Sequence, residues 1–261
     1  MNLYYRFNQE FNKYNDSDDM LKAVYGLDSY TNYDAIIVAP SWTPEKVFKN
    51  YNPVITELRR TAHYCGYEVK VQGKKYGYLL TGSCSGKVID CCMMLGQSVY
   101  SKIIFIGYAG SLVNDVKLGD IVTPSYSIAG DGGSLYLYYN ISKENYRNKI
   151  YQDDECISEL KAAGENTDIK VMDKIIYCTD TIFCEYLHLD EIKELGSEVI
   201  EMETAAFMRC MELMNKKYNI ILCISDNSTC GNALIGRCED DTEKIHNSRE
   251  VNVPKLIFEL T

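Results

Sequence analysis

Three acidic residues that follow short apolar runs have the residue types and spacing that a reactive ligand site would need. Glu201 comes directly after the apolar pair at 199–200 and Glu203 two residues later, and Asp226 lies just beyond the apolar run at 220–224. Ligands of open α/β sheets bind at the carboxyl ends of the strands, so we expect these carboxyl groups to face one pocket. Because carboxyl groups in different surroundings can act as acids, bases or electrostatic partners, the pattern indicates an enzyme.

The strands and helices that must position these acids follow from the apolar pattern. Short β-rich runs alternate with amphipathic segments along the 261-residue chain, which is typical of an α/β domain. Apolar residues at i, i+3, i+4 and i+7 predict one helix over 88–95 and another over 207–214. Strands are expected at 35–39, 68–71, 76–80, 102–106, 120–122, 135–139, 174–177, 198–200 and 219–224.

Composition excludes several kinds of partner. The formal net charge is −10, and no Lys/Arg cluster is present to bind a phosphate backbone, so we expect no nucleic-acid partner. No run of about 18 apolar residues could span a bilayer and no targeting signal is visible, which predicts a cytoplasmic protein without a membrane partner. The eleven cysteines form no CxxC pair and the three histidines lie far apart, which predicts reduced core thiols and no metal site.

Several motifs in series resemble the nucleoside phosphorylase and nucleosidase superfamily. They are Ile106-Gly-Tyr-Ala-Gly-Ser-Leu112, Leu118-Gly-Asp-Ile-Val-Thr-Pro124, Asp131-Gly-Gly-Ser134, Val199-Ile-Glu-Met-Glu-Thr-Ala-Ala206 and Ser225-Asp226-Asn227. They occur in the family's order, and a series of motifs is far more specific than a single one. The resemblance implies a catalytic domain over residues 34–261, with a central mixed, partly barrel-like β-sheet flanked by helices.

The same resemblance implies a homo-oligomer, which is a trimer or hexamer in the phosphorylase branch and a dimer in the hydrolase branch. It does not reach residues 1–33, which are acidic and tyrosine-rich. We expect this N-terminal extension to be a helical arm or a cap on a neighbouring subunit.

Cleavage of the bond between a base and its ribose has two chemical needs. Positive charge builds on the sugar and negative charge on the departing base, so an ionised carboxylate suits the sugar and a protonated one suits the base. The resemblance assigns Glu203 to the ribose hydroxyls, Met202 to the contact beneath the sugar and Glu201 to a supporting role. Structural alternatives are that Glu203 opens a helix and that Asp226 is an N-cap.

The base should lie against Asp226 and a flat side chain. In relatives an aspartate at this point hydrogen-bonds or protonates the imidazole nitrogen of a purine, so Asp226 favours a purine-type nucleoside over a pyrimidine one. Phe183 resembles the family's stacking phenylalanine, although the spacing is one residue longer and Ile182 is the alternative. An aromatic residue at such a position can equally be part of the core.

The group that accepts the sugar stays open between phosphate and water. Phosphorylases of the family place an arginine and a Ser or Thr around the central glycine-rich turn, where this chain has Phe105 and Tyr108. Without that arginine, a phosphate dianion loses its bidentate partner. The remaining candidates for contacting an anion are Gly107, Tyr108, Ala109, Arg59 and Arg60. The two arginines also fit a solvated helix face.

Hydrolytic relatives, which act on methylthioadenosine and similar nucleosides, activate water with a glutamate after the first strand. Glu45 matches that glutamate if two residues are inserted, but it also fits an ordinary helix start with Pro44 in first position. The segment at 131–134 looks closer to the phosphorylases. Phosphate therefore remains a possible co-substrate, and we expect no metal or organic cofactor.

Two other classes of protein are alternatives to a nucleoside-cleaving enzyme. A nucleoside-binding or storage protein on the same fold has no reason to keep both Glu203 and Asp226, which are kept here. An NAD-type dehydrogenase is excluded because no G-x-G-x-x-G opens a helix after the first strand.

Overall fold

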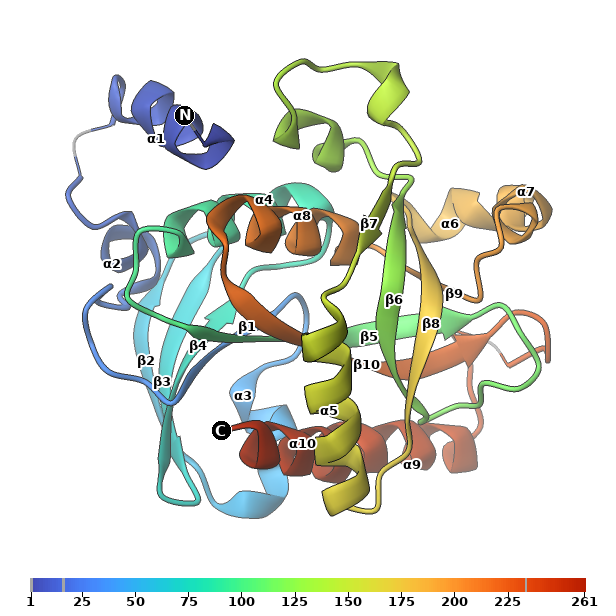
Figure 1. Cartoon of the computed structure of the whole chain (residues 1–261). Coiled ribbons are helices and arrows are strands. Elements are labelled where there is room, and N and C mark those ends of the chain that lie inside the picture. Colours follow the sequence, from blue (N-terminus) through green and yellow to red (C-terminus); the bar gives the residue numbers. More distant parts are fainter. Residues whose placement is uncertain (1, 16, 233) are drawn as a thin grey trace.

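The apolar runs assemble into one mixed β-sheet in the computed structural model, which describes residues 2–15, 17–232 and 234–261 (Figure 1). Within these ranges the sheet has ten strands. They are β1 (Ala35–Ala39), β2 (Val54–Arg60), β3 (Cys65–Val71), β4 (Lys74–Leu80), β5 (Lys102–Ser111), β6 (Ile121–Ala129), β7 (Lys149–Tyr151), β8 (Val171–Cys178), β9 (Val199–Glu201) and β10 (Lys217–Asn227).

Part of this sheet closes on itself. The order is β10-β6-β8-β9-β5-β1-β4-β3-β2, and β10 pairs with β5 as well as with β6. The strands β5, β9, β8, β6 and β10 therefore form a closed barrel, and β1, β4, β3 and β2 continue the sheet from β5. The predicted α/β fold with a mixed, partly barrel-like sheet is confirmed. Strands β5 and β10 are buried over most of their length, which explains their near-continuous apolar sequences.

Helices cover both faces of the sheet (Figure 1). Helices α4 (Ser85–Leu95) and α8 (Thr204–Met214) lie together on one face, and α5 (Asp154–Asn166) and α10 (Val253–Leu260) lie together on the other. The other α-helices are α1 (Leu3–Asn12), α2 (Met20–Tyr25), α3 (Pro44–Val47), α6 (Ile182–Glu185), α7 (Leu189–Glu194) and α9 (Glu239–Asn247). A π-helical turn, Ser248–Asn252, links α9 to α10.

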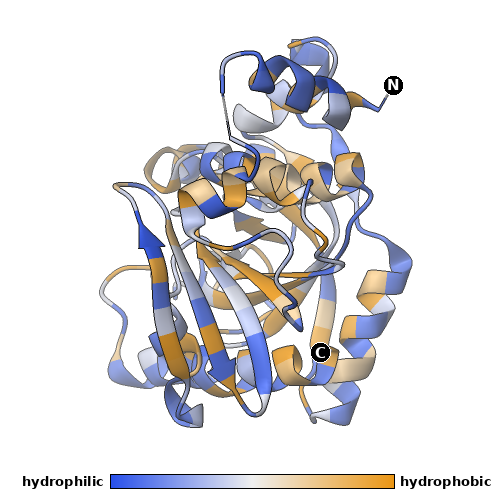
Figure 2. Cartoon of the chain, turned by 90° about the vertical axis from the view of Figure 1, so that its left-hand side faces the viewer, coloured by the Kyte–Doolittle hydropathy of each residue, from blue (hydrophilic) through white to orange (hydrophobic). Residues whose placement is uncertain are grey.

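The core consists of two large apolar layers, one on each side of the sheet, and a smaller third cluster. The predicted helical stripes at 88–95 and 207–214 are confirmed, since Cys91, Leu95, Phe207 and Met211 are completely buried against the sheet. Each large apolar side chain buried in this way contributes roughly 1.5–3 kcal/mol of transfer free energy. Figure 2 shows apolar residues gathered on the strands and on the helix faces that cover them. All eleven cysteines are free thiols, and most of them are buried.

The predicted strand at 135–139 is wrong, because Gly133–Leu137 forms a 3₁₀ helix. The carboxylate of Asp131 accepts hydrogen bonds from the backbone N–H and the hydroxyl of Ser134, which turns the chain before a strand can begin. Tyr136 is 63% exposed, so its aromatic ring contributes no buried face.

Two strands that the apolar pattern did not indicate are β2 and β7. Strand β2 lies at the end of the sheet order and most of its residues are exposed, which removes the buried alternation that marks a strand. Arg59 and Arg60 therefore lie on an edge strand, and the helix face expected for them is a second correction.

The N-terminal extension packs on the domain through α1 and α2. Leu21, Tyr25 and Leu27 are completely buried in the same layer as α4 and α8. The side-chain amide of Asn2 donates to the carbonyl of Leu213 over 3.0 Å, which ties the start of α1 to the end of α8. Among the described residues, no helix is long and apolar enough to cross a membrane.

Candidate active site

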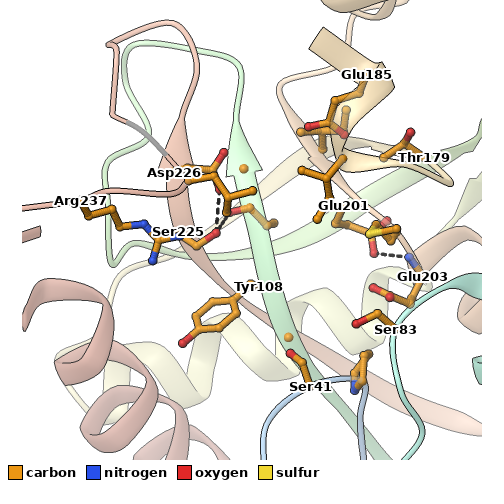
Figure 3. Close-up of a pocket in the computed structure, with 18 residues that line it drawn as sticks. Ser41, Ser83, Tyr108, Thr179, Glu185, Glu201, Glu203, Ser225, Asp226 and Arg237 are labelled. Atoms are coloured by element: carbon orange, nitrogen blue, oxygen red, sulfur yellow. Dashed lines mark hydrogen bonds between the residues drawn. The ribbon is translucent and has the colours of Figure 1, made fainter. Parts of the chain in front are cut away.

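One pocket brings together the acids that the sequence analysis singled out (Figure 3). Its walls come from the ends of β1, β4, β9 and β10, from the second half of β5, and from α6. Glu201, Met202 and Glu203 line it at the end of β9, and Asp226 lines it at the end of β10. In Figure 3, Asp226 lies in the upper part of the pocket and Glu203 in the lower part.

Glu201 and Glu203, here called the β9 acids, divide two tasks between them. Glu201 accepts hydrogen bonds from the backbone N–H of Glu203 over 2.6 Å and of Thr204 over 2.8 Å, and from the hydroxyl of Thr204 over 2.7 Å. Glu201 therefore caps α8, where a carboxylate also complements the helix dipole. Glu203 is the residue at which α8 opens, but its side chain makes no capping bond, so its carboxylate is not used to cap the helix.

The carboxylate of Glu203 is held by the turn between β4 and α4. It accepts a 2.7 Å hydrogen bond from the backbone N–H of Cys84. The backbone of Cys84 has a φ of 89°, a value that residues other than glycine rarely adopt. This strained backbone aims a donor at Glu203, and such strain is often found at functional sites.

Burial sets the electrostatics of the β9 acids. It raises the pKa of Glu203, and the nearby charges of Glu201 and Asp131 raise that pKa further, while the N–H of Cys84 opposes both effects. Burial also raises the pKa of Glu201, against the three donors that favour its ionised form. A ligand that offers hydroxyl donors to Glu203 would therefore stabilise its carboxylate.

Asp226 owes its position to the pairing of β10 with β5. The register shifts between Ile224 and Asp226, and Asp226 then lies opposite Gly110. A Cβ atom at Gly110 would stand only 2.8 Å from Oδ2 of Asp226, so any other residue there would displace this carboxylate. The hydroxyl of Ser225 donates to Asp226 over 2.7 Å.

The N-cap alternative for Asp226 is wrong, because Asn227 orders the following turn. The side-chain oxygen of Asn227 accepts from the backbone N–H of Thr229 over 2.9 Å and of Cys230 over 3.0 Å. Asp226 is left facing the pocket, and it is 6% exposed. Burial raises the pKa of Asp226, opposed by the Ser225 hydroxyl and by the positive charge of Arg237.

The sequence analysis missed two charged residues of the pocket, Glu185 and Arg237. Glu185 ends α6 and is 8% exposed, and burial raises its pKa to about 7 with a smaller contribution from the charge of Asp226. Within the described ranges its carboxyl group has no hydrogen-bond partner. Arg237 lies beside Ser225 and Asp226 in Figure 3. Neither residue belongs to a motif, and no periodic pattern marks the four-residue α6 or the loop after β10.

Phe183 does not supply the flat surface expected for a base. Its ring is 91% exposed and lies outside the pocket, whereas Ile182 lines it. Thr181 begins α6 by accepting from the backbone N–H of Cys184, which is the reason that 182 and 185 share the inner side of this turn. Phe183 then points away from them.

The opposite end of the pocket is lined by Gly107, Tyr108 and Ala109, and the ring of Tyr108 is the aromatic group there. The rings of Trp42 and Tyr108 meet edge to face with centroids 4.6 Å apart. Nη1 of Arg249 donates to the Tyr108 hydroxyl over 3.0 Å, and Arg249 also pairs with Glu250. Burial raises the pKa of Tyr108, so its hydroxyl stays neutral at physiological pH.

The other residues proposed for the acceptor end lie elsewhere. Phe105 is completely buried against Phe207, in the core beneath the turn. Glu45 is exposed on α3 and does not line the pocket. Arg59 and Arg60 stand on the edge strand β2, where Arg60 pairs with Glu57 over 2.6 Å. Neither Arg59 nor Arg60 therefore lines the pocket of the single chain.

Comparison with known proteins places this geometry in a family. A family model described as the phosphorylase superfamily matches residues 35–255. A search of curated protein sequences gives no significant match.

Solved structures share the fold at low sequence identity. A uridine phosphorylase from Vibrio fischeri superposes with a TM-score of 0.71 and 16% identity, covering 91% of this chain and 94% of its own. A 5'-methylthioadenosine/S-adenosyl homocysteine nucleosidase from Campylobacter jejuni gives a TM-score of 0.66 and 16% identity, covering 87% and 98%. The P. knowlesi homolog of P. falciparum PNP gives 0.65 and 18%, covering 87% and 88%.

Proposed function

The chain belongs to the phosphorylase superfamily, and from this premise we propose that it cleaves the N-glycosidic bond of a purine-type nucleoside to free base and sugar. One observation carries the proposal: Glu203 and Asp226 come from separate strand ends and line the same pocket. The solved structures named above include a uridine phosphorylase and a nucleosidase, which supports the choice of this bond.

In the proposed reaction the β9 acids hold the sugar. Glu203 accepts hydrogen bonds from the two ribose hydroxyls, which offsets the cost of keeping a buried carboxylate ionised. Its negative charge then stabilises the positive charge that builds on C1′ as the bond breaks. Glu201 keeps the start of α8, and with it the backbone of Glu203, in place through its three hydrogen bonds. Met202 lines the pocket between them and packs under the sugar.

A purine suits the upper part of the pocket. Asp226 is buried and reaches the pocket from β10, so it can hydrogen-bond the base, and the imidazole half of a purine supplies a ring nitrogen that can take up a proton as the base leaves. A pyrimidine has no such nitrogen. The apolar side chain of Ile182, rather than an aromatic ring, then lies against the base.

We propose water as the acceptor of the sugar. The acceptor end carries Tyr108, whose neutral hydroxyl and Trp42-packed ring replace the cationic and small polar groups that a phosphate dianion needs. The hydroxyls of Ser41 and Tyr108 line this end and can orient a neutral water molecule. The reaction written in this way requires neither a metal ion nor an organic cofactor.

Phosphorolysis is the second candidate, and Arg237 favours it. Its guanidinium group lines the pocket, and a guanidinium can bind phosphate with two parallel hydrogen bonds. In Figure 3, however, Arg237 lies beside Asp226, on the side of the pocket that we assign to the base.

One assay separates these alternatives. The protein is incubated with adenosine, inosine, guanosine, uridine and methylthioadenosine, with and without inorganic phosphate, and the sugar product is identified. We expect free sugar from the purine nucleosides at a rate that phosphate does not change. Ribose 1-phosphate formed only with phosphate would establish phosphorolysis. Release of uracil alone would overturn the purine assignment, and no release from any substrate would favour a nucleoside-binding protein.

A further inference from the structure

Two carboxyl groups, those of Asp226 and Glu185, occupy the upper part of the pocket and are here called the upper acids (Figure 3). Both are more than nine-tenths buried, yet their surroundings differ. Asp226 accepts a 2.7 Å hydrogen bond from the hydroxyl of Ser225 and experiences the positive charge of Arg237. Both neighbours favour its ionised form.

Among the described residues, Glu185 has no hydrogen-bond donor, and no cation is among the influences on its carboxyl group. Burial is the main influence on its carboxyl group, and the negative charge of Asp226 acts in the same direction. An unpartnered buried carboxylate is costly, and a second negative charge nearby raises that cost. When one proton is available to the two groups, it therefore resides on Glu185.

We propose that Glu185 is the acid that protonates the departing base, while Asp226 remains ionised and accepts a hydrogen bond from an N–H group of that base. This inference rests on the proposed nucleoside cleavage and assigns its proton donor. The pocket then selects a purine that presents both an acceptor nitrogen and an N–H donor at its upper end.

The step balances as follows. The C1′–N bond breaks and its electron pair moves into the base, while the proton of the Glu185 carboxyl group transfers to a ring nitrogen. The base leaves neutral, and Glu185 becomes a carboxylate. The oxygen of a water molecule bonds to C1′, and one of its protons is released to solvent. Glu185 regains a proton from solvent before the next turnover.

A substrate that already carries positive charge on its base needs no proton from the enzyme. The sharpest test therefore compares the purine nucleoside that the wild type cleaves fastest with its N7-methylated, cationic form, both at pH 6. In the Glu185→Gln variant we expect kcat/KM for the unmodified nucleoside to fall about 100-fold, at the low end of general acid effects. The methylated nucleoside should change less than about threefold, since its base can leave without protonation.

The controls separate this role from a structural one. Glu191→Gln removes an exposed carboxylate of α7 that pairs with Arg147 outside the pocket, and both substrates should be cleaved at the wild-type rate. Asp226→Asn should slow both substrates, because it replaces the charged acceptor that each base needs with a neutral, weaker one. If Glu185→Gln does not fold, as judged by circular dichroism, Glu185→Ala is measured with the same pair.

Three results would overturn the inference. An equal loss on both substrates would make Glu185 structural, no loss would remove it from the reaction, and selective rescue of Asp226→Asn by methylation would make Asp226 the acid. Failure of the wild type to cleave any nucleoside would instead reject the proposed function, and the assignment of Glu185 with it.

Discussion

The β9 acids and the upper acids are two pairs of buried carboxyl groups in one pocket, and they differ in the number of donors around them. Glu201 and Glu203 together accept four hydrogen bonds, three of them from backbone N–H groups. Asp226 accepts one from a side chain, and Glu185 accepts none within the described residues. Backbone donors stabilise negative charge, whereas their absence favours a proton. Burial raises the pKa at both ends, so the β9 acids can hold charge once the hydroxyls of a ligand join their donors, whereas Glu185, without donors among the described residues, can deliver a proton.

The two pairs also differ in the elements that support them. The β9 acids lie where a barrel strand joins the 11-residue helix α8, which is buried along most of its length. Glu185 ends a helix of four residues, and Leu187, two residues further on, is 87% exposed. We therefore expect substitutions of the β9 acids to lower kcat/KM for every substrate. Substitutions around the upper acids should lower it only for some substrates or only in part of the pH range.

The largest expected effect comes from Glu203→Ala. Loss of this carboxylate removes the partner of the ribose hydroxyls and the negative charge near C1′, so kcat/KM should fall by roughly 1,000-fold on every substrate. The fold should persist, since the capping bonds belong to Glu201, and circular dichroism should be unchanged. Measured kcat/KM values close to those of the wild type would show that Glu203 does not bind the sugar. The contrast between the β9 acids and the upper acids would then be wrong.

A smaller effect is expected from Gly110→Ala. The added Cβ would stand 2.8 Å from Oδ2 of Asp226 and 3.3 Å from a side-chain methyl of Ile200, so the carboxylate must move while the β9 acids stay in place. We expect kcat/KM for purine nucleosides to fall by about tenfold or more, as misplacement of a positioned group does. Gly196→Ala is no suitable control because of its positive φ, whereas Gly86 has open space and a normal φ. An activity in Gly110→Ala equal to that of Gly86→Ala would show that Asp226 does not need its present position.

Sequence patterns predicted the parts of the molecule that depend on local order. The barrel strands β5 and β10 contain long apolar runs because both of their faces are buried, and a motif identifies the acids at the end of β9. Each of these features can be recognised from a few consecutive residues. The correct placement of Glu203 and Asp226 in one pocket follows from strand ends and motif order together.

The missed features depend on contacts between distant segments. Glu185 reaches the pocket because α6 follows β8 in the barrel, and four residues are too few to show helical periodicity. The 3₁₀ turn after Asp131 is formed by side-chain hydrogen bonds that compete with strand pairing. Phe183 matched the motif only with one extra residue, and its side chain is exposed outside the pocket.

The pH dependence of the reaction tests the proton on the upper acids. The pKa of Glu185 is raised from 4.5 to about 7, so below that pH the carboxyl group can donate and above it the proton is lost. We therefore expect kcat/KM for adenosine, whose base does not titrate in this range, to fall about fivefold between pH 7 and 8. Asp226 is the charged neighbour that acts on Glu185, and the other charged side chains lining the pocket are Arg237, Glu201 and Glu203.

The variant Glu185→Gln provides the control for this profile. A glutamine cannot titrate, so the decline above pH 7 should disappear along with most of the activity. A decline that persists in Glu185→Gln would place the titrating proton on another group, with the β9 acids as the next candidates because burial raises their pKa as well.

The smallest effect should come from Phe183→Ala, paired with Ile182→Ala. The Phe183 ring is 91% exposed and outside the pocket, so its removal should change kcat/KM by less than about twofold. Ile182 lines the pocket, and its truncation should raise KM for purine nucleosides by about three- to tenfold through lost apolar contact. If Phe183→Ala is the more damaging change, the ring must reach the base during the reaction. The helix α6 would then have to turn about its axis, which would carry Glu185 away from Asp226 and remove the distinction between the two pairs of acids.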